Sequence, residues 1–222
     1  MINISQSSVF AQENQDSNNW DNQLFVGNKV SGGEDQWKYS GELQFRMKDN
    51  FSQLDNWFVE GVFQYLPSKH WEFVPDFRFS VHPEGVEYRP GFGVLFKVLS
   101  PKWQFVNQVK YQADIYGYGG RGVGHGIRHT MFLNHVYSEK LVPTLAAGYF
   151  FSSNDRFTGL EFVRFGGGVT LIMDPVHRLN ISYFFGVAND GKNLFWSGIP
   201  LIQLTIVLRD DYKYVPAHYI NF

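Results

Sequence analysis

A glycine-rich stretch, YGYGGRGVGHG at residues 116–126, is the first segment whose composition could serve chemistry. Clustered glycines cradle phosphate where a strand gives way to a helix and a Lys-Ser or Lys-Thr pair follows. In this sequence neither a helical pattern nor a Lys-Ser or Lys-Thr pair follows the glycines. We therefore interpret the segment as a loop that joins two structural elements.

Three histidines and a serine, His125, His129, His135 and Ser138, lie in and just after this stretch. A serine activated by a histidine hydrolyses esters, and lipids carry such bonds. The spacing matches no hydrolase of this kind, so we favour ordinary histidines near a membrane interface. A lipid-modifying hydrolase with its site among His129, His135 and Ser138 stays as an alternative.

Composition excludes several other chemistries. The 222 residues contain no cysteine, so there is no thiolate catalysis, disulfide or Cys-ligated metal. The seven histidines form no HExxH motif or other close metal pair, and we predict neither a metal nor a cofactor. A net charge of -2 with mixed signs gives no reason to expect nucleic acid as a partner. Hydrophobic residues make up 44% of the chain, which is enough for a folded domain.

Alternation with a period of two runs along most of the chain. In WEFVPDFRFSV, residues 71–81, apolar side chains occupy every odd position and, apart from Val74, polar side chains every even one. A period of two is typical of a β-strand with chemically different faces. The same pattern predicts ten strands, at residues 37–47, 57–65, 71–81, 86–98, 103–115, 127–138, 141–151, 157–173, 179–187 and 202–208.

Two flanking segments, 23–31 and 212–222, could supply an eleventh and a twelfth strand. Short links rich in Pro, Ser and Gly, such as LPSK and HPEG, predict hairpins between neighbours in sequence. A meander of this many strands must close or split, because open edges expose unpaired backbone groups. We predict an all-β fold: a transmembrane, antiparallel, up-and-down β-barrel of 10–12 strands with a polar, charged lumen.

Strand length and aromatic content favour a membrane barrel over a soluble sandwich. The predicted strands reach about 10 to 14 residues, against about five or six in ordinary sheets. Trp and Tyr gather near strand ends, where membrane barrels carry their aromatic girdles. No run of about 18 apolar residues exists, so a transmembrane helix is not expected.

Facing the polar side inward places charges of both signs in the lumen. These are the acids Glu42, Glu60, Glu72, Asp76, Glu87 and Asp114 and the bases Arg46, Arg78, Arg89, Lys97, Lys110, Arg128, Arg178 and Arg209. Charges inside a narrow tube must pair, because desolvation penalises a lone ion. We predict that a ring of Arg46, Glu60, Glu72, Arg78 and Arg89 acts as a gate or plug.

The segment from about residue 20 to 209 resembles a family of small outer-membrane barrels of unknown function from Gram-negative envelopes. The resemblance depends on LFVGNKVSGGEDQWKYSGELQFRM and on VFQYLPSKHWEF. It implies fold and location and brings no catalytic residues. The long segment after Arg209 departs from the family pattern.

The two ends of the chain resemble an export signal and an assembly signal. Val9 and Ala11 precede a polar stretch, as at the end of a signal peptide. We assign residues 1–12 to a signal-peptide remnant, 13–22 to a leader and 23–222 to one barrel domain. Phe222, with Ile220 two positions before it, resembles the C-terminal recognition signal of outer-membrane barrels.

The predicted function is a non-enzymatic barrel of the outer membrane, structural or a narrow channel for small polar solutes. An alternative is a barrel subunit of a larger envelope complex. The expected partners are outer-membrane lipid, the barrel assembly machinery during insertion, and possible subunits of that complex.

Overall fold

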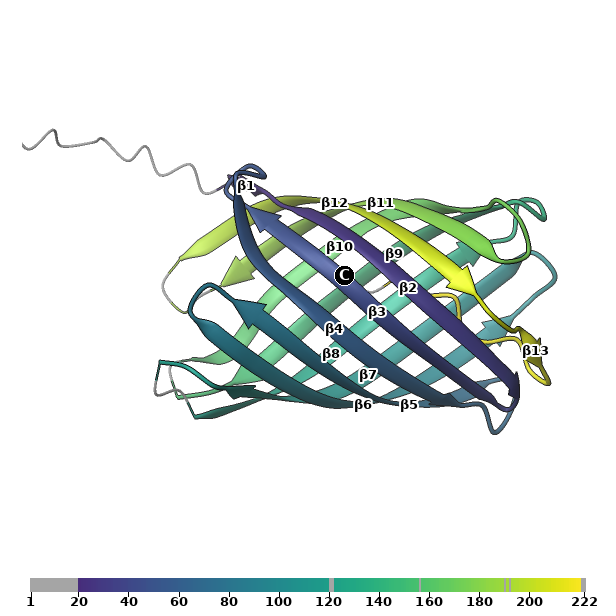
Figure 1. The fold of residues 1–222 in the computed structure, drawn as a ribbon, viewed down its shortest axis with the longest axis horizontal. Coiled ribbons are helices and arrows are strands. Elements are labelled where there is room, and N and C mark those ends of the chain that lie inside the picture. Colours follow the sequence, from purple (N-terminus) through teal and green to yellow (C-terminus); the bar gives the residue numbers. More distant parts are fainter. Residues whose placement is uncertain (1–19, 120–121, 156, 190, 192, 221–222) are drawn as a thin grey trace, which may run out of the picture.

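The computed structural model describes residues 20–119, 122–155, 157–189, 191 and 193–220, and these form a closed β-barrel (Figure 1). Strands β2 to β12 make up the wall. The strands are β1 (Trp20–Asn22), β2 (Leu24–Asp35), β3 (Trp37–Lys48), β4 (Gln53–Tyr65), β5 (Trp71–His82), β6 (Gly85–Leu99), β7 (Trp103–Tyr116), β8 (Val123–His135), β9 (Leu141–Ser153), β10 (Thr158–Ile172), β11 (His177–Asn189), β12 (Leu194–Val207) and β13 (Asp211–Tyr212).

Each wall strand pairs antiparallel with the next, but the closing pair is parallel. The seam joins β12 to β2 from Leu201 opposite Phe25 to Val207 opposite Ser31. With eleven strands in a meander, the first and the last run in the same direction, so closure must be parallel. The all-β barrel prediction is confirmed, and its strand count lies within the predicted range, but the barrel is mixed rather than purely antiparallel.

The two ends of the barrel differ in what they carry. Strand β1 extends the seam at one end, which we call the β1 end, and β13 extends it at the other, the β13 end (Figure 1). Of the predicted leader, Trp20–Asn22 form β1; residues 1–19, including the predicted signal-peptide remnant at 1–12, lie outside the described residues.

Several predicted boundaries differ from the observed ones: for example, the strands predicted to begin at 57 and 202 begin at Gln53 and Leu194. The loop at 116–126 is shorter than expected, because β8 already begins at Val123. The possible twelfth strand at 212–222 is not seen in its described part: among residues 212–220 only Tyr212 is in a strand, and residues 213–220 leave the sheet. Pro216 within this segment lacks the N–H that a strand would need for pairing. Phe222 lies outside the described residues.

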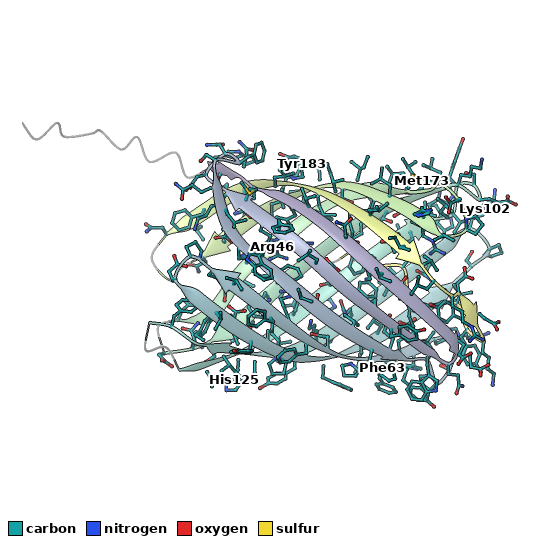
Figure 2. The ribbon with its side chains drawn as sticks, viewed as in Figure 1. Arg46, Phe63, Lys102, His125, Met173 and Tyr183 are labelled. Atoms are coloured by element: carbon teal, nitrogen blue, oxygen red, sulfur yellow. The ribbon has the colours of Figure 1, made fainter. Side chains whose placement is uncertain are left out.

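Side chains on the wall divide by face as the alternation predicts. In β5, Phe73 and Phe77 are exposed on the outside, whereas Glu72, Val74 and Arg78 are buried inside. Large apolar side chains are exposed on every strand from β2 to β12. Figure 2 shows Phe63 and Tyr183 projecting outward and Arg46 lying within the barrel. No helix among the described residues is long and apolar enough to cross a membrane.

Candidate functional site in the barrel lumen

The middle of the lumen contains a compact group of ion pairs. Arg78 on β5 contacts the Glu60 carboxylate on β4 at 3.1 Å. Lys110 on β7 lies 2.7 Å from Asp76 and 3.6 Å from Glu60. These side chains are almost fully buried, so the pairing offsets the desolvation of each charge. The predicted pairing of lumen charges is found here.

A second group of ion pairs lies nearer the β1 end. Arg89 on β6 contacts Asp114 at 2.5 Å and Glu87 at 2.8 Å. Arg89 is also the direct cross-strand partner of Arg78. Two arginines can face each other here because each contacts a carboxylate of another strand, Glu60 for Arg78 and Asp114 for Arg89.

The five predicted gate residues all face the lumen but do not form one ring. Glu60 and Arg78 contact each other, whereas Glu72 contacts Lys97 at 2.6 Å near the β13 end. Arg46 donates through Nε to Gln44 at 2.7 Å. Arg209, which we predicted inside, lies beyond the end of β12 at the rim, half exposed and in contact with Glu34. The strand ends before it, so the inward alternation no longer applies. Gating by the five residues stays a prediction.

Arginines and phenylalanines alternate across the lumen toward the β1 end. The guanidinium of Arg78 lies 3.8 Å from the ring centre of Phe58, and that of Arg46 lies 5.0 Å from the same ring. Arg46 is also 4.3 Å from Phe25 on β2. A guanidinium over an aromatic face is attracted by the negative potential of the ring.

The alternation continues on the opposite wall. Arg164 on β10 lies 5.8 Å from Phe25 and 4.4 Å from Phe162, so Phe25 is shared across the lumen. Arg128 lies 5.5 Å from Phe162 and 5.6 Å from Phe150. We call this set the arginine–phenylalanine layer: Phe25, Arg46, Phe58, Arg78, Arg128, Phe150, Phe162 and Arg164.

The last described residues, 213–220, turn back into the barrel from the β13 end, and we call them the tail. Lys97 Nζ donates to the Val215 carbonyl at 2.6 Å, and the Ala217 N–H donates to Glu72 Oε1 at 2.5 Å. Glu72 and Lys97 are completely buried and also contact each other. The tail backbone is thus bound to a buried ion pair of the wall.

Amide side chains bind the following residues of the tail. Gln104 donates to the Pro216 carbonyl at 3.3 Å and accepts from the His218 N–H at 2.7 Å. Asn134 donates to the His218 carbonyl at 2.8 Å, and His218 Nε2 lies 3.0 Å from Thr170 Oγ1. Because these partners come from β7, β8 and β10, the tail connects much of the circumference.

The end of the tail is packed inside the barrel. Ala217 and Ile220 are buried within the apolar cluster of the lumen, and Tyr219 packs against it. The predicted recognition signal requires Ile220 to lie on a lipid-facing strand. Ile220 lies inside the barrel instead. A cavity of about 370 Å³ remains beside the tail, lined in part by Lys38, Arg178 and Asp210.

His218 lies in an unusual electrostatic environment. It belongs to the tail and not to a strand. Burial lowers its pKa to about 4, and the positive charges of Lys38, Arg178 and Lys29 act in the same direction. His218 is therefore neutral at pH 7.

The residues of the hydrolase alternative are not brought together. His129 and His135 are on the outer face of β8, six positions apart, which separates them by about 20 Å at roughly 3.3 Å per residue. His129 contacts Asn107 at 3.1 Å, His135 stacks on Trp103, and Ser138 lies in an exposed turn. His125, at the start of β8, contacts the Tyr111 hydroxyl at 2.7 Å. Within the described ranges, no three His, Asp or Glu side chains form a potential metal site.

Sequence reasoning missed the return of the tail into the lumen. Two signals could have indicated it: the charged Arg209–Asp210–Asp211 run that ends β12, and Pro216 within the supposed twelfth strand. Both disfavour a further wall strand.

Comparison with known proteins agrees with this geometry. A closed barrel with an apolar exterior and a charged lumen defines a porin-like class. A solved structure of the NanC porin matches with a TM-score of 0.53 at 13% identity, covering 74% of this chain and 86% of that one. At this identity the likeness shows the fold alone.

The family is defined by sequence. The model of DUF2490, a protein family of unknown function, matches residues 18–193. The chain belongs to this family, and the predicted membership in a barrel family of unknown function is confirmed. Comparison with the curated proteins finds no match.

Proposed function

We propose that this protein is a non-enzymatic barrel of the outer membrane, whose lumen is a narrow passage for small polar solutes and whose tail closes it. The observation that carries the proposal is the apolar outer face of all eleven wall strands around a charged interior. A strand of 12 residues such as β5, tilted by about 40°, rises roughly 30 Å, which suits a bilayer.

Aromatic residues at the two ends support membrane insertion. Trp37, Trp71 and Trp103 are exposed at the first positions of β3, β5 and β7, at the β13 end. Trp20 and Trp196 are exposed near the β1 end. Indole rings prefer the interface between headgroups and acyl chains. Outer-membrane lipid and, during insertion, the barrel assembly machinery are the partners that this proposal requires.

The position of the tail favours the proposal that the passage is closed at rest. Its backbone bonds to β5, β6, β7 and β8, and its apolar end occupies the lumen. Solutes would pass when the tail leaves, and the charges of the wall would then contact them. The ion pairs among Glu60, Arg78 and Lys110 leave the wall polar without the tail.

Planar-bilayer recordings test this function. We expect low conductance from the intact chain and at least about tenfold more from a chain that ends at Tyr212. Heat-modifiability on gels confirms that each protein is a folded barrel. If neither chain conducts, even with Arg78 and Arg89 changed to Ala, the lumen is not a passage and the barrel is structural.

A further inference from the structure

A small cavity lies inside the barrel between the seam strands and the tail. It measures about 70 Å³, several times the roughly 10–15 Å³ that one water needs. Its lining includes Lys29 of β2, Lys38 of β3, Arg178 of β11, Gln203 of β12 and His218 of the tail. The space is sufficient for a compact polyatomic group.

The charged side chains that line this cavity are all positive: Lys29, Lys38 and Arg178. Neither lysine makes an ion pair within the described part of the chain; instead their Nζ atoms lie 5.1 and 6.0 Å from the ring centre of Tyr219. Three like charges around one space repel each other, and a bound anion would remove that repulsion.

Two carboxylates, Asp210 and Glu42, lie near these cations. Asp210 lies 3.7 Å from Arg178 Nη2 and is largely exposed, so water screens the pair. Glu42 is opposite Lys29 on β3, and its Oε1 accepts a hydrogen bond from Gln44. Neither acid lines the cavity.

Two buried donor atoms of the lining have no hydrogen-bond partner. They are Nε2 of Gln203, whose side chain is more than nine-tenths buried, and Nε of Arg178. Buried donors in folded proteins normally find an acceptor. An acceptor inside the cavity would satisfy both atoms as well as the two lysines.

We propose that this cavity binds a small oxyanion of the phosphate class, held by Lys29, Lys38, Arg178 and Gln203. A phosphate group supplies several acceptor oxygens and between one and two negative charges near neutral pH, and guanidinium and ammonium groups bind it well. The cavity of about 370 Å³ shares Lys38 and Arg178 with this site, so it has room for the organic part of a phosphate ester. The site does not require the barrel to conduct.

Calorimetric titration of the folded protein in detergent at pH 7 tests the site. Inorganic phosphate probes the free anion, and glycerol 3-phosphate probes the phosphate group of a larger solute. We expect at least one to bind. Lys38→Gln and Gln203→Leu should each raise its Kd about tenfold, because each removes a donor that faces the anion.

Two matched variants separate the site from general charge effects. Lys38→Arg keeps the charge and should bind within about threefold of the wild type, and Lys102→Gln removes an exposed lysine of the β6–β7 turn and should bind unchanged. Heat-modifiability shows whether each variant is folded. Absence of binding for both ligands in the folded wild type, or equal affinity in all folded variants, overturns the proposal. Bilayer conductance does not enter this test. The anion site can therefore be disproved without disproving the proposed passage, and the reverse also holds.

Discussion

The N–H of Ala217 donates to the same carboxylate oxygen of Glu72 that contacts Lys97, although Ala217 and Glu72 are 145 positions apart in sequence. The contact joins the end of the chain to the inner face of β5. Both residues are buried, so loss of this hydrogen bond should expose the tail to a measurable degree.

Changing Glu72 to Gln should release the tail. The amide keeps the shape but leaves buried Lys97 without its counter-charge, which costs about 3–5 kcal/mol in comparable buried pairs. Because the native chain has no cysteine, a single Ala217→Cys reports tail exposure through its rate of maleimide labelling. We expect labelling to become at least about tenfold faster.

The matched control for Glu72→Gln is Asp55→Asn. Asp55 pairs with Lys48 in an exposed ion pair near the β1 end, and exposed pairs contribute little. Labelling of Ala217→Cys should change less than about twofold in this control. Equal rates for the two variants would show that Glu72 does not retain the tail.

Acidification should release the tail through His218. Its pKa is about 4 in the docked tail, against 6.5 for a free histidine, so the released state binds the proton more tightly. Docking is therefore strongest above about pH 6.5 and weakens as the pH falls from there toward about 4. The cations Lys38, Arg178 and Lys29 surround His218 and act in the same direction. An environment-sensitive dye attached at exposed Val215→Cys should report the change.

The variant His218→Asn isolates this titration. It cannot take up a proton, so the change between pH 6.5 and 4 should be lost or strongly reduced. An identical pH profile in this variant would assign the transition to other groups, such as the Glu72–Lys97 pair.

Phe77→Arg should destabilise the barrel in lipid. Phe77 is 50% exposed in the middle of β5, where the proposed membrane band would lie. Arginine at the bilayer midplane of a barrel costs about 2–4 kcal/mol. Urea unfolding from lipid vesicles measures this difference.

Phe51→Arg is the control for Phe77→Arg. Phe51 is 45% exposed but lies in the β3–β4 turn, outside the strands. Its change should stay within about 0.5 kcal/mol, as for most surface substitutions. If both variants were nearly neutral, water and not lipid would contact the outer face.

Gly166→Ala should disrupt the pairing of β10 with β11. A Cβ at this position would collide with the Tyr183 carbonyl, which is backbone and cannot move aside, and it would lie 2.7 Å from Cα of Phe184. Overpacking of this kind costs about 1–3 kcal/mol. Gly61→Ala, where a Cβ meets nothing within 4 Å, should be tolerated. Equal urea-unfolding midpoints for the Gly166→Ala and Gly61→Ala variants would contradict the close approach of β10 and β11 at Gly166.

Much of the wall could be predicted from alternation alone. In WEFVPDFRFSV the period of two decides that Phe77 faces outward and Arg78 inward, because a strand has two faces and their chemistry differs. The same reasoning placed Glu60, Glu72 and Arg89 inside correctly. It failed at Arg209, because alternation holds only while the strand continues.

Relations across the lumen could not be predicted in this way. Arg46 and Arg164 both contact Phe25, although β3 and β10 lie on different parts of the wall. The curvature and closure of the sheet decide which inward side chains meet. Neither is encoded in the period of any one strand.

The sequence by itself determined which residues face outward and which face inward, since that depends on local backbone geometry and on the preference of apolar groups for an apolar surrounding. Only the tertiary structure decided the parallel seam, the return of residues 213–220 into the lumen and the meeting of Lys29, Lys38 and Arg178 at one cavity. These depend on strand number and closure, which bring together segments that are distant in the chain.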